Sequence, residues 1–424
     1  MKLTVFQAGE GDCLLLQTRD GKNMLIDGGM VGSYRDHAAP TIVKLPQLDL
    51  VCVSHIDNDH IAGIVALMGD AFKWHVHQLH VDGNDKTHKK PSVAQPPKIL
   101  ELWHNGFGAQ LGNESMQKQI AGMLAASAAR LDFGSAQDTW KASRYRALAN
   151  SVPQGIELSQ RVSSEQLGIP LNKAFKGKLA LVRKGAKPIK LGSVKLTVIG
   201  PFEDDLKNLR KEWRDFLDDP VNKKALDDLQ KRLRADVKSL DFGDVQLFRS
   251  TLAAAAGEIG NRTEVTVPNL ASLMLLARED DGKTVLLTGD GYAGDIIKGL
   301  ERSGDLKPGG KLHVDVLKVQ HHGARANITD EFCERVTADH YVICSDGAND
   351  NPDEPTLKAL FKARLADGAT PFKLWFNSRS TVVTADDKSK RMAAVETTVK
   401  AAAKEHPKLL SFEFLEKSFF ELKL

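Results

Sequence analysis

One turn of this sequence combines four side chains that can bind metal ions with two flanking apolar runs. Residues 50–53 are typical of a short buried strand, and residues 61–68 are typical of an apolar helix. The turn between them carries His55, Asp57, Asp59 and His60. Two imidazoles and two carboxylates at this spacing can serve two divalent ions, His55 with Asp57 for one and Asp59 with His60 for the other. A solvated acidic loop with incidental histidines is disfavoured, because unpaired charge beside buried elements is costly.

Two later apolar runs also end on residues that can bind metals. Residues 284–288 lead into Asp290, and residues 314–319 lead into His321 and His322. Gly-Asp is also a common turn, so each signal alone is modest. In layered α/β folds, however, sites gather at strand ends, where a rigid sheet holds side chains open to solvent. We therefore expect Asp290 and His322 to join the first cluster.

Three other stretches each allow two interpretations. Asp12 ends a Gly-Glu-Gly-Asp run and either approaches the metal site or belongs only to a turn. Asp27 follows an apolar strand and either hydrogen-bonds a metal-binding histidine from behind or is a turn aspartate. His75 and His77 could share one strand face and chelate a metal, but their alternation with apolar residues favours a half-exposed strand at residues 74–82.

Composition sets limits on the class of protein. The chain has 424 residues, with 42% hydrophobic and 27% charged residues and a net charge of +3, which are ordinary globular values that neither require nor exclude a nucleic-acid partner. The four cysteines form no CxxC pair, which favours reduced core residues. No apolar run approaches the ~18 residues of a membrane span. The N-terminus reads directly as a strand without a leader, so we expect a cytoplasmic protein with no membrane contact.

The rest of the chain alternates strands and helices, which predicts an α/β fold. The expected strands lie at residues 3–7, 14–18, 24–27, 176–183, 193–199, 272–277, 341–345, 373–376 and 381–384, with a final pair within 410–424. The expected helices lie at residues 98–104, 116–131, 356–365 and 390–405. Residues 203–240 are densely charged and predict a projecting helical hairpin, for which a solvated pair or a dimer contact is favoured over a nucleic-acid arm.

Taken in order, these motifs resemble those of the metallo-β-lactamase superfamily, whose fold is an αββα sandwich with a dinuclear metal site at one edge. The usual ligand turn there is His-x-His-x-Asp-His, whereas this chain has Asp57 at the third position. With that variant, residues 8–12, 25–29, 286–290 and 317–323 resemble the hydrolase domain of the competence protein ComEC. The resemblance implies one domain over residues 1–424, with largely helical insertions at 83–190 and 203–262. The membrane segments of ComEC are absent, so DNA uptake is not expected.

The resemblance also implies a ligand set. One metal would take His55 and Asp57, and the other would take Asp59, His60 and His322. Asp290 would bridge the two metals, and the residues assigned to catalysis are Asp59, Asp290 and His321.

Further positions follow from the same resemblance. Asp27 and Asp12 would stand behind the ligands, and His321 would contact substrate or support its neighbour. The third histidine of the superfamily would fall near Asn269, which makes Asn269 a candidate contact to metal or substrate and leaves the first metal weakly held. Asn351 stands where relatives often carry a histidine that could protonate a leaving group.

The function implied is that of a metallohydrolase with two divalent ions, Zn²⁺ or Mn²⁺. Asp57 in place of an imidazole makes the first site harder and more anionic, which widens the choice of metal beyond zinc. The leading hypothesis is a phosphodiesterase or nuclease that uses a hydroxide activated by the dinuclear centre on a nucleic-acid or phosphodiester substrate. The alternatives are a hydrolase of small esters, lactones or cyclic nucleotides, and a metal-binding partner protein with little activity. A homodimer or protein partner could use the charged helices at 203–240.

Overall fold

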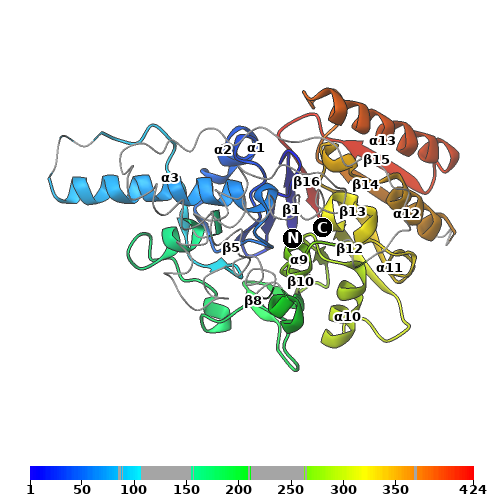
Figure 1. Cartoon of the computed structure of the whole chain (residues 1–424), viewed down its shortest axis with the longest axis horizontal. Helices are drawn as coiled ribbons and strands as arrows, with labels where there is room; N and C mark the ends of the chain where they lie inside the picture. Colours follow the sequence, from blue (N-terminus) through cyan, green and yellow to red (C-terminus); the bar gives the residue numbers. More distant parts are fainter. Residues whose placement is uncertain are drawn as a thin grey trace, which may run out of the picture.

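The computed structural model describes residues 1–106 except 85, 86 and 88, residues 154–208 except 156, residue 211, and residues 262–424 except 263, 264 and 367–369. Two facing β-sheets lie at the centre, and helices cover their outer faces (Figure 1). The expected helix at residues 116–131 lies outside the described residues. So does the charged hairpin at 203–240, apart from helical residues 203–208 and residue 211.

The first sheet has the strand order β16-β1-β2-β3-β5-β7. Its strands are β1 (Lys2–Phe6), β2 (Leu14–Gln17), β3 (Asn23–Ile26), β5 (Leu50–Cys52), β7 (Leu102–Trp103) and β16 (Phe419–Lys423). A turn at Gly21 joins antiparallel β2 and β3, whereas β5 runs parallel to both β3 and β7. A separate parallel pair is formed by β4 (Gln47–Leu48) and β6 (Lys98–Ile99).

The second sheet has the strand order β15-β14-β13-β12-β11-β10-β9-β8. Its strands are β8 (Ile189–Leu191), β9 (Val194–Gly200), β10 (Met274–Glu279), β11 (Thr284–Leu287), β12 (Leu312–Lys318), β13 (Val336–Ile343), β14 (Phe372–Phe376) and β15 (Leu410–Phe414). The strands from β11 to β15 are parallel, and β8 to β11 are antiparallel.

Helices pack on both outer faces because each sheet presents apolar side chains on two sides. Buried Ile61, Ile64 and Leu67 of α3 (Asn58–Asp82) join the core of the first sheet. The second sheet is covered by α10 (Ala293–Ser303), α11 (Asp330–Arg335), α12 (Glu354–Ala366) and α13 (Asp386–Glu405). A third apolar cluster lies between the sheets. The expected αββα sandwich is therefore confirmed.

Short helical segments complete the described chain. They are α1 (Val31–Ser33), the π-helix η1 (Tyr34–Ala38), α2 (Ala39–Ile42), α9 (Val267–Leu270), and the 3-10 turns η2 (Lys173–Phe175), η4 (Gln320–Gly323), η5 (Arg325–Asn327) and η6 (Ala348–Asp350). The expected reduced core cysteines are confirmed, since Cys13, Cys52, Cys333 and Cys344 are free and buried. No described helix is long and apolar enough to cross a membrane.

Four predicted elements were wrong. The strand at residues 74–82 is the second half of α3, which continues until Gly83 ends it. The helix at 98–104 is replaced by β6 and β7, because β4 offers a strand partner to β6 and the edge of β5 offers one to β7, which overrides local propensity. Residues 176–183 form no strand, since the Ala180 backbone bonds to the Asn105 side chain. Residues 381–384 begin in a turn closed by Val382.

The two strands expected within residues 410–424 are confirmed as β15 and β16, and they lie in different sheets. The two C-terminal strands do not pair with each other, because β15 pairs with β14 in the second sheet and β16 pairs with β1 in the first. The last strand therefore ties the C-terminus to the N-terminus, and both termini lie at the centre of Figure 1.

Candidate metal centre

The candidate site lies where strands of both sheets end. In the first sheet, parallel β3 and β5 are followed by Asp27 and by Ser54-His55. In the second, parallel β11 and β12 lead to Asp290 and to His321-His322. Helix α3 begins directly after Asp57. The fold thus brings the three sequence motifs to one edge of the sandwich.

A glycine allows the loop that carries Asp12 to reach this edge. A Cβ atom placed on Gly11 would lie 1.6 Å from the backbone oxygen of Asp59, so no other residue fits without moving the start of α3. The Gly-Glu-Gly-Asp run is therefore more than a turn. It packs directly against the metal-binding segment and places Asp12 in the buried cluster.

Two groups of donor atoms share one oxygen of Asp290. In the first group, His55 Nε2 lies 3.6 Å from Asp57 Oδ2 and 3.7 Å from Asp290 Oδ2. In the second group, His322 Nε2 lies 3.1 Å from Asp59 Oδ2 and 3.4 Å from Asp290 Oδ2. The structure thus places Asp290 between the two groups, as a bridging carboxylate would be.

The imidazole of His60 belongs to the second group. A hydrogen bond between its Nδ1 atom and Asp27 orients the ring. His60 Nδ1 is 2.9 Å from Asp27 Oδ2, which leaves Nε2 facing Asp290 Oδ2 at 3.3 Å. His322 Nδ1 is likewise 2.7 Å from the carbonyl oxygen of Cys344, and the two Nε2 atoms are 3.4 Å apart. An acceptor at Nδ1 fixes the tautomer that offers Nε2 to a metal. Asp27 therefore has the supporting position expected for it.

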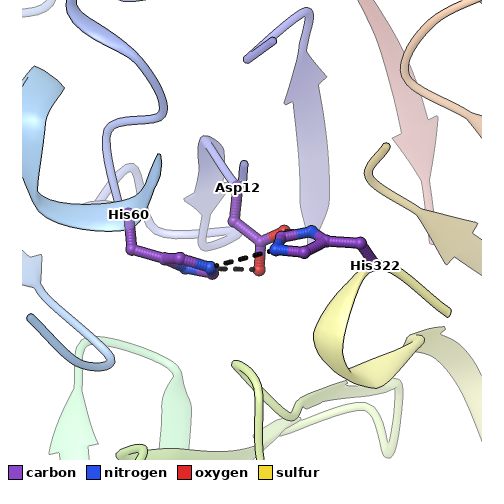
Figure 2. Close-up of side chains that lie close together, drawn as sticks. All are labelled: Asp12, His60 and His322. Atoms are coloured by element: carbon purple, nitrogen blue, oxygen red, sulfur yellow. Dashed lines mark hydrogen bonds and ion pairs between the residues drawn. The ribbon is translucent and has the colours of Figure 1, made fainter. Parts of the chain in front are cut away.

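Asp12 lies between the rings of His60 and His322 (Figure 2). Its carboxylate oxygens are 3.8 Å from His60 Nδ1 and 3.6 Å from His322 Nδ1. Buried Lys318 forms an ion pair with Asp12, and its Nζ is 3.5 Å from Asp290 Oδ1. Lys318 also donates to the carbonyl oxygen of Gly289 at 2.9 Å. This cation partly compensates the carboxylates of the cluster.

The donor set fits a pair of divalent cations. The buried His55 Nε2 makes no hydrogen bond within the described residues, and Asp290 Oδ1 has there the 3.5 Å contact with Lys318 Nζ but no hydrogen bond. An unpaired buried polar atom costs about 1–3 kcal/mol unless a ligand satisfies it. Imidazole nitrogens combined with carboxylate oxygens suit zinc, and the high carboxylate content also suits manganese.

Electrostatics supports the same assignment. Burial alone would lower the pKa of His60, but the carboxylates led by Asp290 and Asp59 outweigh it and raise the pKa well above the usual range. The pKa of His322 rises to about 10 because Asp290, Asp59 and Asp12 likewise overcome its burial. The same histidines lower the pKa of Asp59 and of Asp290 against the effect of burial. The carboxylates thus stabilise positive charge in the cluster. In the metal-free protein the protonated histidines supply this charge, and divalent cations would supply it in place of the protons.

Three residues of the site have strained backbones. Asp27, His321 and His322 have φ values of 55°, 45° and 56°, in the left-handed region that non-glycine residues seldom adopt. Such conformations cost on the order of 1–3 kcal/mol each and persist where surrounding contacts hold them. Here they occur directly after β3 and β12, where the chain turns its side chains into the cluster.

Half-buried His321 and buried Asn269 lie beside the two groups of donor atoms. His321 Nδ1 is 2.7 Å from Asn327 Oδ1, and its Nε2 is 3.7 Å from Asp290 Oδ2. Asn269 Nδ2 is 3.2 Å from His321 Nε2, so Asn269 contacts an imidazole of the site. Burial is the main cause that lowers the pKa of His321, despite the opposing effect of Asp290.

Sequence reasoning missed several residues of the site. Lys318 stands within the apolar run at residues 314–319, and a lysine in a buried strand was the signal that could have revealed it. Asn327 contacts His321 and also donates to the Asp290 carbonyl oxygen at 2.8 Å. Ser54 donates to Asp27 at 2.7 Å through its hydroxyl. His104 follows β7 in the core, where burial lowers its pKa to about 4. No local pattern marks Asn327, Ser54 or His104.

Comparison with known proteins agrees with this architecture. Residues 7–101 match the model of the metallo-beta-lactamase superfamily, and the paired sheets with their outer helices form the metallo-beta-lactamase fold. The matched part contains the ligand turn, whereas Asp290 and His322 lie beyond it. No curated protein matches the chain.

A solved structure of a mutant of CmlA beta-hydroxylase is similar to this chain at 10% identity, with a TM-score of 0.35. The similarity covers 99% of this chain and 54% of that one, so the chain spans about half the length of that protein.

Proposed function

We propose that the chain is a metal-dependent phosphodiesterase that acts on nucleic acid. The observation that carries the proposal is the buried cluster in which two groups of donors share one oxygen of Asp290. His55, Asp57 and Asp290 would hold one cation, and Asp59, His60, His322 and Asp290 would hold the other. When bound, two divalent cations supply Lewis-acid activation of water and neutralise charge on a phosphodiester.

Two bound divalent cations would favour an anionic substrate over a neutral one, although part of their charge would be offset by Asp57. The Asp57 carboxylate, in place of an imidazole, adds negative charge to the centre, and the cations must compensate that charge. An oxygen ligand also allows hard cations to bind. A phosphodiester brings its own charge to such a centre. Lactones and neutral esters lack this charge and gain less from two cations.

His321 has the position of a proton-transfer residue. Its Nδ1 is occupied by Asn327, and Nε2 faces the cluster beside Asp290 and Asn269. The lowered pKa keeps the imidazole neutral at neutral pH with its proton on Nδ1, so that Nε2 can accept a proton from the attacking water and then pass it to a leaving oxygen. Its side chain is 27% exposed, which leaves it accessible to a substrate. It would take the role of the histidine that is missing at Asn351.

The test is metal analysis combined with a cleavage screen in zinc and in manganese. The substrates are single-stranded DNA, duplex DNA, RNA, cyclic dinucleotides, a small activated phosphodiester and a lactone. We expect bound metal and cleavage of a polynucleotide and of the activated phosphodiester. Asp59→Asn should remove both activities, while Asp36→Asn, at an exposed aspartate that makes no contact with the cluster among the described residues, should retain them.

Other outcomes would replace the proposal. Hydrolysis restricted to the lactone or to a cyclic nucleotide would assign the same centre to a small-molecule hydrolase. Bound metal with no turnover of any ester would indicate a binding protein.

A further inference from the structure

A basic segment outside the metal centre is not explained by the hydrolytic site. Residues 173–190, hereafter the basic segment, contain seven lysines and arginines and no acidic residue. All seven are exposed. None forms an ion pair with a described carboxylate, in contrast to surface residues such as Lys358 and Lys362, which pair with Glu354 and Asp330. Clustered like charges without partners create a positive local potential.

Hydrogen bonds fix the position of the basic segment, although it contains little regular secondary structure. The side chain of buried Asn172 accepts from the His104 N–H at 3.0 Å and donates to the His104 carbonyl at 2.8 Å. The side chain of Asn105 does the same for Ala180, at 2.8 and 2.7 Å. The N–H of Val182 donates to the Pro201 carbonyl at 2.9 Å. Two buried asparagines thus fix the charged residues to the chain that follows β7.

This anchoring places the start of the basic segment near the metal-binding edge. Strand β7 runs parallel to β5, and the Val53 N–H donates to the Trp103 carbonyl at 2.9 Å. His104 and Asn105 therefore follow β7 at the end of the sheet where Ser54 and His55 follow β5. Neighbouring strands lie about 4.8 Å apart. The asparagine anchors and the metal ligands are consequently neighbours across adjacent strand ends.

The surface of the basic segment is hollowed. A hollow of about 440 Å³ has Phe175 and Val198 among its apolar walls and Lys178, Arg183 and Lys187 among its cations. A second hollow of about 400 Å³ shares Lys178 and Arg183 and also includes Glu203. Arg302, at the end of α10, extends the positive lining of the first hollow. Apolar walls with cationic rims suit a nucleotide, which has an apolar base and a charged phosphate.

We propose that the basic segment binds the sugar-phosphate backbone of a polynucleotide and leads it towards the metal centre. The inference rests on the proposed function and extends it, because it selects long substrates over small phosphodiesters. The lysine and arginine side chains neutralise backbone phosphates, whereas bases rest in the hollows. The two asparagine anchors keep this surface at a constant position relative to the ligands.

The test compares two triple variants of equal charge change. K178Q/K184Q/K187Q removes three exposed lysines of the basic segment, and K390Q/K404Q/K408Q removes three exposed lysines in or next to α13. Lys176 is left unchanged because its φ is 58°. Binding of metal-free protein to a labelled single-stranded oligonucleotide of about 20 nucleotides is measured by fluorescence anisotropy between about 50 and 200 mM salt. Hydrolysis of a small activated phosphodiester is measured on metal-loaded protein.

We expect the first variant to bind about tenfold more weakly, with a salt slope reduced by about 2, since three single-strand phosphate contacts are lost. The α13 variant should bind within about twofold of the unchanged protein, and both should hydrolyse the small substrate normally. Equal weakening in both variants, or no binding by the unchanged protein, would overturn the inference.

Competition by other polyanions and hydrolysis by the metal-loaded protein distinguish a failure of this inference from a failure of the proposed function. Polyglutamate or anionic vesicles that compete as well as the oligonucleotide would show a different acidic partner and would also overturn the inference. Absence of all phosphodiester hydrolysis by metal-loaded protein would instead refute the proposed function. Because binding is measured without metal, the two failures are distinguishable.

Discussion

Both halves of α3 carry histidines, but the two halves differ in burial and in their contribution to the site. The first half begins with Asp59 and His60 and packs Ile61, Ile64 and Leu67 into the core. The second half carries His75, His77 and His80 and projects beyond the sheets (Figure 1). Its Leu79 and Val81 side chains are 57% and 50% exposed. One continuous helix therefore contains both a buried site and a solvent-facing stretch.

The difference shows that histidine spacing alone does not make a metal site. His60 is completed by residues from elsewhere in the chain, with Asp27 behind its Nδ1 and Asp290 before its Nε2. No described cluster of potential metal ligands includes His75, His77 or His80. A site arises where tertiary contacts bring carboxylates to the imidazoles.

The largest expected effect comes from Asp290→Asn, which changes the cluster that the first half of α3 helps to form. Asp290 Oδ2 lies between 3.3 and 3.7 Å from nitrogens of His55, His60, His321 and His322, so its charge serves the whole cluster. We expect loss of bound metal and an activity loss greater than the 10–100-fold typical of residues that only orient ligands. Metal analysis and kinetics provide the readout. Asp82→Asn at the far end of α3 is the control, and an unchanged metal content in Asp290→Asn would contradict the assignment.

A second prediction contrasts two glycines of the same helix. A Cβ on Gly63 would lie 2.0 Å from the carbonyl oxygen of Gly28, whereas a Cβ on Gly69 would meet nothing within 4 Å. Gly63→Ala should destabilise the fold by about 1–3 kcal/mol through overpacking. Gly69→Ala should stabilise it by about 0.5–1 kcal/mol through helix propensity. Urea unfolding measures both, and effects of the same sign would show that the first half of α3 is not tightly docked.

The third prediction concerns pH. Nearby carboxylates raise the pKa of His322 to about 10 in the metal-free protein, against the opposing effect of burial. A histidine whose pKa is raised by folding stabilises the folded state fully when the pH is below about 6.5, the ordinary pKa of histidine. The stabilising contribution of His322 should therefore decline as the pH rises from about 6.5 to 10. Metal displaces these protons, so metal affinity should increase over the same range by up to about tenfold per pH unit and proton. Competition with a chelating indicator measures this, and an affinity independent of pH would argue against His60 and His322 as ligands.

The smallest effect is expected in the second half of α3. H75Q/H77Q/H80Q should leave metal content and hydrolysis within about twofold of the unchanged protein. Its unfolding free energy should shift by no more than about 0.5 kcal/mol, as is usual for surface positions. A loss of metal in this triple variant would mean that these histidines take part in binding and would remove the contrast between the two halves.

Much of the fold could be read from local patterns. The runs at Val5, Leu25 and Val285 are short and apolar, so they indicated strands that the structure contains. The strand prediction at residues 74–82 failed because alternation of Trp74, Val76 and Leu79 with histidines fits either period over so short a stretch. The helix continues because no glycine or proline interrupts it after Gly69 until Gly83.

The sequence by itself determined the types of the candidate ligands and their positions at strand ends, because both depend on residues close together in the chain. Tertiary structure decided which atoms face each other. His60 and His322 are 262 residues apart, and their Nε2 atoms meet only because the two sheets stack. The ion pair of Lys318 with Asp12 and the contact of Asn327 with His321 depend equally on the path of the backbone after β12. Burial then determines the charge of each group, since desolvation and neighbouring carboxylates act only in the folded chain.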